Sequence, residues 1–176
     1  MKKSFKQFGV IFAVAIFTLI TSCSNDDNGG GGGSASVGTI TGKAGGSSFT
    51  TISQGTTAML ASNGSFQNLA IQGATITGKT IQLVIIGQNI AAGTYQILDT
   101  DSETNAAAVY GELDINNPTS AQTWSAPYTG MANTSSITIT SISATNVKGT
   151  FTFTGQGENG TKNITDGSFN VNISAN

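Results

Sequence analysis

The stretch TFTFT at residues 150–154 decides the fold, because apolar and polar side chains alternate along it without a break. Alternation with a period of two places the phenylalanines on one face of a β-strand and the threonines on the other. The same pattern recurs in ITIT at residues 137–140 and in FNVNI at residues 169–173. Each segment is therefore expected to bury one face in a core and to expose the other.

Further strands are expected on both sides of this pattern. Residues 81–86, IQLVII, are nearly all apolar, which predicts a central strand covered on both faces. About ten short, mostly antiparallel strands predict an all-β domain, either a β-sandwich, which we favour because nothing argues for closure, or a β-barrel. The remaining candidate strands are residues 39–42, 48–52, 57–61, 66–72, 94–98, 107–113 and 123–128.

Turn-forming residues separate these segments. Asn63-Gly64 suits the positive φ angles of a tight hairpin. The glycine-rich stretch 155–160 separates two strong strands and ends in Asn159-Gly160. Asn116-Asn117-Pro118 indicates another loop.

The N-terminus has the three parts of a secretory signal peptide. Three lysines within the first six residues precede the uncharged apolar run FGVIFAVAIF at residues 8–17, and small residues then lead to Cys23. The apolar run is shorter than the about 20 residues that a membrane-spanning helix needs. We therefore expect residues 1–22 to be a signal peptide that is removed, rather than a transmembrane anchor.

The segment ITSC at residues 20–23 resembles the lipobox of bacterial lipoproteins. In those proteins the cysteine thiol is lipidated, the chain is cut just before it, and the new amino terminus is acylated. The resemblance implies that Cys23 carries acyl chains such as palmitate, which together anchor the protein to a membrane. The alternative is an ordinary cysteine of a secreted protein. Cys23 is the only cysteine, so an intramolecular disulfide is excluded.

Residues 23–37 are expected to form a flexible, glycine- and serine-rich tether before a single β domain at residues 38–176. Ser24 is not the aspartate that resembles an inner-membrane retention signal, so the outer membrane is expected. Asp26-Asp27 resembles the acidic export signal of surface lipoproteins of the Bacteroidota, which implies exposure at the cell surface. The alternative is a domain that faces the periplasm.

The composition excludes several classes of function. The chain has no arginine, and its seven lysines, three of them in the signal peptide, stand against nine acidic residues. This balance does not supply the basic surface that nucleic acid requires. The chain also has no histidine, which excludes Ser-His-Asp and Cys-His catalysis and histidine-ligated metals. We predict neither a nucleic-acid partner nor a cofactor.

Two matches to nucleotide-binding motifs lack the context that these motifs need. Residues 73–80, GATITGKT, fit the Walker A pattern, but a P-loop leads into a helix and residues 81–86 predict a strand. Residues 155–160, GQGENG, fit the dinucleotide pattern, but residues 161–165 also predict a strand. Both stretches are expected to be turns, and no nucleotide is predicted.

Carboxylates are the remaining groups able to catalyse hydrolysis. A glycosidase needs two of them across a sugar. Asp99, Asp101 and Glu103 form the densest oxygen-ligand cluster and are weak candidates for binding Ca²⁺; the alternative is a solvated acidic loop, since the EF-hand glycine is absent. No catalytic pair stands out, so we predict that the protein is not an enzyme. The other carboxylates considered are Glu112, Asp114, Glu158 and Asp166.

Trp124 and Tyr128, with Tyr110, are the candidate ligand-binding residues. Exposed aromatic rings stack on the faces of sugars. Since the domain has one tryptophan, packing in the core is the alternative role for these rings, and it is the commoner one.

Five short segments carry a resemblance to a known family: residues 136–140, 148–153 and 164–170, Gly93-Thr94-Tyr95 and Thr41-Gly42-Lys43. Together they resemble a domain family of unknown function that is common in lipoproteins of the Bacteroidota. The resemblance implies an exported all-β domain and supplies no activity, ligand or catalytic residue. Residues 44–46 replace a shorter connection expected in the family, which leaves the register of the first hairpin open.

The sequence thus predicts a membrane-anchored lipoprotein whose domain is a non-enzymatic binding module for a glycan or another extracellular ligand. The alternative is a structural or envelope-assembly protein that contacts protein partners through a sheet face or edge. Exposed aromatic residues beside a groove favour the first function. A flat apolar patch without a concave pocket favours the second.

Overall fold

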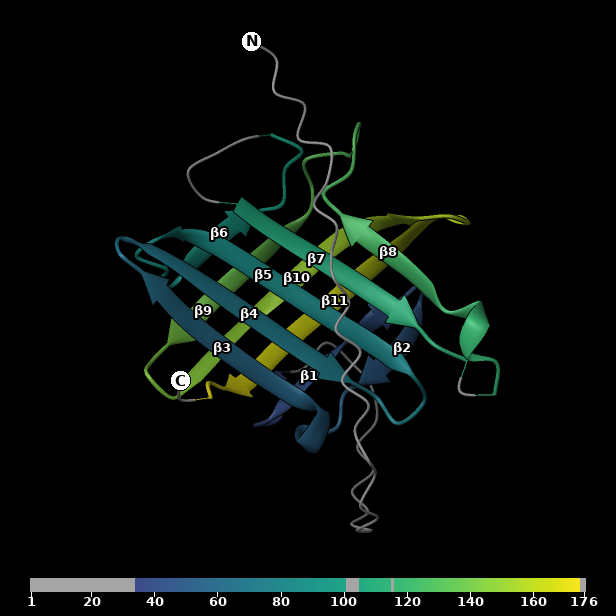
Figure 1. Cartoon of the computed structure of the whole chain (residues 1–176), viewed down its shortest axis with the longest axis horizontal. Coiled ribbons are helices and arrows are strands. Elements are labelled where there is room, and N and C mark those ends of the chain that lie inside the picture. Colours follow the sequence, from purple (N-terminus) through teal and green to yellow (C-terminus); the bar gives the residue numbers. More distant parts are fainter. Residues whose placement is uncertain (1–33, 101–104, 115, 175–176) are drawn as a thin grey trace.

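The computed structural model describes residues 34–100, 105–114 and 116–174. These residues form eleven strands in which every strand pairing is antiparallel, which confirms the predicted all-β class (Figure 1). Two short 3-10 helices, η1 (Ser53–Gly55) and η2 (Pro118–Ser120), lie between strands. The strands are β1 (Thr39–Ala44), β2 (Ser47–Thr50), β3 (Thr56–Asn63), β4 (Phe66–Ala74), β5 (Lys79–Gln88), β6 (Gly93–Gln96), β7 (Asn105–Glu112), β8 (Gln122–Ala126), β9 (Ser136–Ile142), β10 (Asn146–Gly157) and β11 (Gly160–Asn172).

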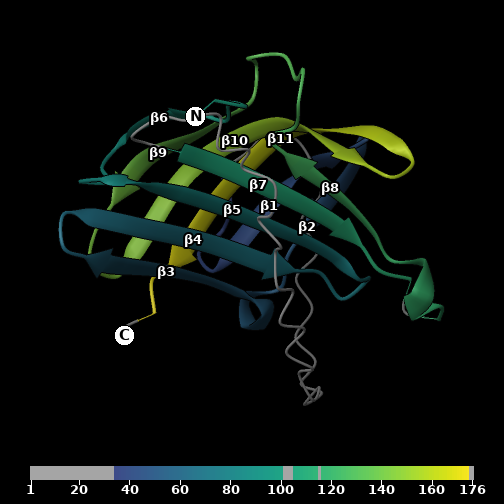
Figure 2. The same ribbon diagram turned by 45° about the horizontal axis from the view of Figure 1, so that its top comes forward.

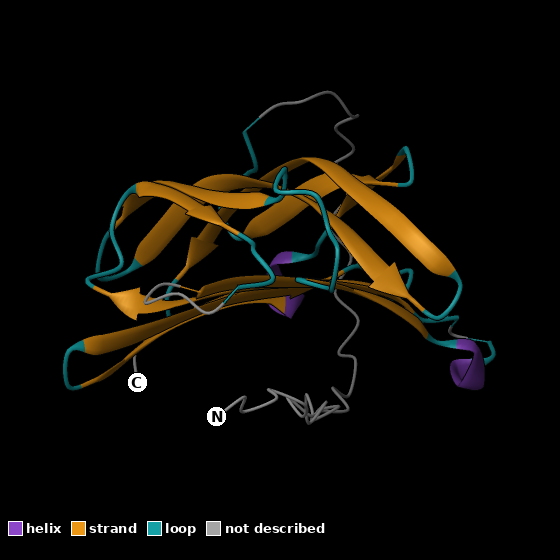
Figure 3. Cartoon of the chain, turned by 90° about the horizontal axis from the view of Figure 1, so that it is seen from above, coloured by secondary structure: helices purple, strands orange, loops and turns teal. Residues whose placement is uncertain are grey.

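The strands form one hydrogen-bonded sheet that folds into two layers (Figure 3). The rear layer of Figure 1 contains β2, β1, β11, β10, β9 and β6, and the front layer contains β8, β7, β5, β4 and β3. The layers are joined at β10, which pairs with β9 near its start and with β8 at Gln156. On the opposite side the end of β11 lies near β3 (Figure 2), and Ile173, the residue after β11, forms an isolated parallel bridge with Ala58 of β3. The domain is therefore a sandwich whose two sides are partly closed, as in a barrel.

Side chains that alternate along the strands meet between the layers and form the core. In β10 the inward-pointing Phe151 and Phe153 are buried, whereas Lys148 and Thr150 are exposed, as the alternation of the sequence predicts. Tyr110 in the front layer is also fully buried. Burial of each large apolar side chain stabilises the fold by roughly 1.5–3 kcal/mol.

Strand β5 is central, but it is covered on one face only. Ile81, Leu83 and Ile85 are buried in the core, while Ile86 is 37% exposed and Val84 is half-buried. The prediction of cover on both faces is therefore wrong. The apolar run fills the core with its odd-numbered residues and places its even-numbered residues on the outer face of the front layer.

Short turns fix the registers of the hairpins. Gly45 and Gly46 both have positive φ angles, 54° and 85°, and β1 pairs with β2 without a register shift, so the first hairpin is regular. The expected turn at Asn63-Gly64 lies one residue further along, because Asn63 still pairs with Phe66. Strands β10 and β11 likewise extend into the glycine-rich stretch, since Gly157 pairs with Gly160.

Both matches to nucleotide-binding motifs lie at hairpin turns, as predicted. Residues 73–80 join β4 to β5, and the Thr75 amide donates to the Lys79 carbonyl at 2.8 Å. Residues 155–160 contain the end of β10 and the start of β11. Neither stretch leads into a helix.

Contacts of the β domain extend into the segment that the sequence assigns to the tether. Ala35 is buried, and its carbonyl accepts a hydrogen bond from Asn170 Nδ2 at 3.3 Å. The Gly38 amide donates to the Asn170 carbonyl at 2.7 Å. The chain thus lies against β11 from Ala35 onward.

Candidate functional site

Four side chains from three strands meet where the front and rear layers join. Tyr110 and Glu112 belong to β7, Trp124 to β8 and Lys162 to β11. Tyr110 and Trp124 are direct cross-strand partners, with ring centres 6.1 Å apart. We call these four residues the Glu112 cluster.

Two donors hold the Glu112 carboxylate in the cluster. The Tyr110 hydroxyl donates to Glu112 Oε1 at 2.9 Å, and Lys162 Nζ lies 2.8 Å from Oε2. Lys162 Nζ also lies 3.6 Å from the centre of the Trp124 ring and 5.7 Å from that of Tyr110. Each carboxylate oxygen therefore has one partner within the protein, which fixes the orientation of Glu112.

Two glycines of β10 allow the layers to approach at this point. A Cβ atom at Gly155 would lie 2.8 Å from Trp124 Cβ, and a Cβ atom at Gly157 would lie 3.0 Å from Trp124 Cδ1. These distances are shorter than ordinary packing contacts between carbon atoms. The absence of a side chain at both positions lets β10 lie directly against the backbone and ring of Trp124.

The Glu112 cluster contains a neutral hydrogen-bond donor, the Tyr110 phenol, and an ionised acceptor, the Glu112 carboxylate. Burial raises the pKa of Tyr110, and the hydrogen bond to Glu112 and the charge of Glu112 raise it further, so the phenol remains protonated. Burial also acts to raise the pKa of Glu112. The hydrogen bonds from Lys162 and Tyr110, with the charges of Lys162 and Lys79, outweigh that effect and lower the pKa. Glu112 is therefore an ionised acceptor at neutral pH.

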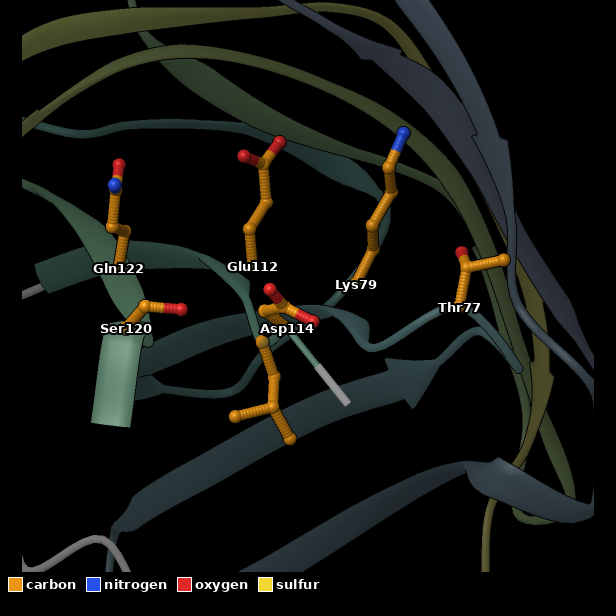
Figure 4. A pocket seen from close by; sticks show the side chains of 7 residues that line it. Thr77, Lys79, Glu112, Asp114, Ser120 and Gln122 are labelled. Atoms are coloured by element: carbon orange, nitrogen blue, oxygen red, sulfur yellow. The ribbon is translucent and has the colours of Figure 1, made fainter. Parts of the chain in front are cut away.

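A pocket of about 370 Å³ opens beside Glu112 (Figure 4). Lys79, Glu112 and Gln122 are consecutive cross-strand partners on β5, β7 and β8, and their side chains extend side by side. All lining residues except Leu113 are polar, so the pocket offers hydroxyl, amide, ammonium and carboxylate groups. The remaining lining residues are Thr77, Asp114 and Ser120.

The structure does not expose the aromatic rings that the sequence suggested as ligand-binding platforms. Trp124 is 4% exposed and Tyr110 is 0% exposed. Their rings pack in the core, so the prediction that they stack on a ligand is wrong for these two residues. Tyr128 is half-buried and belongs to neither β8 nor the pocket.

In the sequence, Glu112 is one of seven candidate carboxylates, and nothing marks Lys162 as a functional residue. Their spacing along the chain gives no signal, because the contact joins β7 to β11 across a layer junction. The alternation of residues 107–113 would have placed Tyr110 and Glu112 on one face of a strand. It could not have shown that Lys162 reaches the same place.

Other predicted sites lie wholly or partly outside the described residues. Cys23 is outside them, as are Asp101 and Glu103, while Asp99 lies just before that gap. In the described part of the chain, no three acidic, histidine or cysteine residues are grouped so that they could hold a metal ion. Among the same residues, no helix has the length and apolar character needed to cross a membrane.

Comparison with known proteins gives no match of any of three kinds: no family model, no curated protein and no solved structure matches this chain.

Proposed function

We propose that the protein is a membrane-anchored lipoprotein whose domain is a non-enzymatic binding module, with its ligand site in the pocket beside Glu112. The observation that carries this proposal is the restrained Glu112 carboxylate at the wall of a polar pocket. Tyr110 and Lys162 fix the carboxylate from the protein side. The side chain of Glu112 is still 37% exposed, so it can accept further hydrogen bonds from a ligand.

A polyhydroxylated ligand, such as the end of a glycan, suits this arrangement. Glu112 and Asp114 accept hydrogen bonds from hydroxyl groups, Lys79 donates, and Gln122 does both. Since Lys79, Glu112 and Gln122 follow one another across three strands, they are spaced by about 4.8 Å, the distance between neighbouring strands. A row of this kind contacts several hydroxyl groups of one ligand.

The Glu112 carboxylate is less suited to catalysing hydrolysis than to binding a ligand. A glycosidase needs a general acid whose pKa is raised, so that the proton is present at working pH. The pKa of Glu112 is lowered, and both of its oxygens already accept hydrogen bonds. These properties support binding without bond cleavage.

Binding is tested with the full chain in detergent micelles, by calorimetric titration with a panel of short neutral, amino and acidic oligosaccharides. Glu112→Gln keeps the size of the side chain and removes its charge, and Gln122→Ala removes a neighbouring contact without touching the cluster. Glu158→Gln, at the exposed β10–β11 turn, is the matched control. We expect Glu112→Gln to weaken binding by at least about tenfold, since a hydrogen bond to a charged group contributes about 1.5–3 kcal/mol. Equal affinities for Glu112→Gln and Glu158→Gln would contradict the proposal.

A second candidate function is attachment to an envelope protein, which the outer face of the front layer favours. Met59, Ala70, Val84 and Ala107 are consecutive cross-strand partners on β3, β4, β5 and β7 and form an apolar row. Met59 is 50% exposed, and Ile86 beside this row is 37% exposed. If this row is a protein interface, Met59→Glu would abolish crosslinking of the chain to its protein partner in intact cells. The same substitution would leave oligosaccharide binding unchanged.

We further propose attachment to the outer membrane with the domain at the cell surface, and the periplasmic face as the alternative orientation. The support is the lipobox-like segment ending at Cys23, Ser24 after it, and the acidic pair Asp26-Asp27. The resemblance of residues 136–140, 148–153 and 164–170 to a Bacteroidota lipoprotein domain agrees with this proposal.

A further inference from the structure

A second hollow lies on the outer face of the rear layer, away from the pocket beside Glu112. It has a volume of about 530 Å³ and follows β9, β10 and β11. Its polar lining consists mainly of hydroxyl groups, which come from Ser34, Ser136, Thr140, Thr150, Thr152 and Ser168. We call this hollow the hydroxyl groove.

Two of the lining residues, Thr150 and Ser168, belong to a longer row of hydroxyl side chains on the same sheet. Strand pairing places one serine or threonine on each of six neighbouring strands at the same level of the sheet: Thr94, Thr138, Thr150, Ser168, Thr41 and Thr50. Neighbouring strands are about 4.8 Å apart, so the hydroxyl groups repeat at that interval across the sheet. Thr94 and Thr138 are hydrogen-bonded to each other at 2.9 Å, which orients part of the row.

Two irregularities in strand pairing shape the groove. Strand β11 bulges at Asp166, whose φ angle is 51°, and the register with β10 shifts between Phe151 and Phe153. The register of β10 with β9 shifts between Lys148 and Gly149. Bulges bend a strand and increase its local twist. The two shifts lie on opposite edges of β10 and flank Thr150, which explains why the sheet is hollowed there.

Two charged residues line the groove, and one of them is neutralised by an ion pair. Lys148 and Asp166 lie in its wall, and Asp166 is paired with Lys43 at 2.9 Å. Hydroxyl groups both donate and accept hydrogen bonds. A surface made mainly of uncharged hydroxyl groups fits a ligand that is itself neutral, elongated and rich in hydroxyl groups.

We propose that the hydroxyl groove binds a neutral polysaccharide chain that lies across the strands of the rear layer. Thr150, at the centre of the row and in the groove, is the principal contact. This proposal stands independently of the function proposed for the pocket beside Glu112. The groove and the pocket lie on different layers and share no lining residue.

The test is native electrophoresis of the full chain in mild detergent, through gels that contain a neutral β-glucan, dextran or sulfated dextran. Thr150→Val removes the hydroxyl and keeps the β-branched shape, and Thr150→Lys fills the groove with a charged chain. The matched controls are Thr123→Val and Thr123→Lys, at an exposed position of β8 in the front layer. Thermal unfolding establishes that each variant is folded.

We expect a neutral polysaccharide to retard the wild-type chain and both Thr123 variants. We expect Thr150→Val to raise the dissociation constant derived from the retardation about fivefold, the loss typical of one hydrogen bond. We expect Thr150→Lys to abolish retardation. Retardation of the Thr150 variants equal to that of the wild type would overturn the proposal. So would retardation of the wild type by sulfated dextran alone, or by no polysaccharide, because binding would then depend on charge or be absent. If Glu112→Gln were no longer retarded while Thr150→Lys still was, the polysaccharide would bind in the pocket beside Glu112. That result would overturn the proposal for the hydroxyl groove.

Discussion

Lys162 Nζ lies 3.6 Å from the centre of the Trp124 ring, and this contact joins the rear layer, which carries the lysine, to the front layer, which carries the tryptophan. The same ammonium group forms an ion pair with Glu112 at 2.8 Å. One side chain thus connects the core aromatic residues to the carboxylate in the wall of the pocket. Replacement of any member of this cluster is expected to affect both stability and binding.

Replacement of Lys162 by alanine is expected to lower the free energy of unfolding by about 1–2 kcal/mol. The variant loses the cation–π contact with Trp124 and the partner of a partly buried carboxylate. Lys43→Ala removes an ion pair of similar length, with Asp166, in which both side chains are more than a third exposed. That control is expected to cost under about 1 kcal/mol. Urea denaturation of both variants measures the difference, and equal losses would show that the position over Trp124 adds nothing.

The stability contributed by Glu112 is expected to depend on pH. Its pKa is lower in the folded protein than in the unfolded chain, where the usual value is about 4.3. The contribution is therefore fully present above pH 4.3 and is lost as the pH falls through the lowered value. Melting temperatures of the wild type and Glu112→Gln between pH 7 and pH 2.5 should converge on acidification. A difference that stays constant over this range, or that grows toward acid, would disprove the assigned shift.

Substitution of Gly157 by alanine is expected to destabilise the domain by about 1–3 kcal/mol, because the added methyl group would clash with the Thr123 carbonyl oxygen and overpack the contact with the Trp124 ring. Gly93→Ala is the control. A Cβ atom at Gly93 meets nothing within 4 Å, and this strand residue has no positive φ angle. Thermal unfolding compares the two variants. If Gly157→Ala is as stable as Gly93→Ala, the close approach of β10 and β8 does not depend on glycine.

Much of this fold could be predicted from the sequence, because alternation with a period of two is a local property. Residues 150–154 and 169–173 lie in strands β10 and β11, with the expected faces buried. The prediction that residues 81–86 are covered on both faces is wrong, because the sequence does not distinguish apolar residues on an outer face, such as Val84 and Ile86, from buried ones. Alternation also cannot show which strands of the two layers lie side by side. The contact between Lys162 and Glu112 could therefore not be predicted from the sequence.

Cys23→Ser is expected to leave the chain without acyl chains and to release it from membranes. Incorporation of labelled palmitate and phase partition in detergent compare this variant with Ser22→Ala, which keeps the thiol and a small residue before it. Lipid label on Cys23→Ser would contradict acylation at Cys23. Protease treatment of intact and lysed cells then separates the two orientations. Digestion in intact cells supports the cell surface, and protection until lysis supports the periplasmic face.

The single tryptophan reports directly on whether a polyhydroxylated ligand occupies the pocket beside Glu112. Trp124 contacts Lys162, and Lys162 contacts Glu112, so a ligand at the carboxylate should change the environment of the indole. The measurement is the indole N–H resonance of Trp124 in the full chain during titration with the oligosaccharide that binds best. We predict a saturable shift in the wild type and in Glu158→Gln that is absent or strongly weakened in Glu112→Gln. Saturable binding with an unmoved Trp124 resonance, or the same shift in Glu112→Gln, would place the ligand elsewhere and contradict the proposed site.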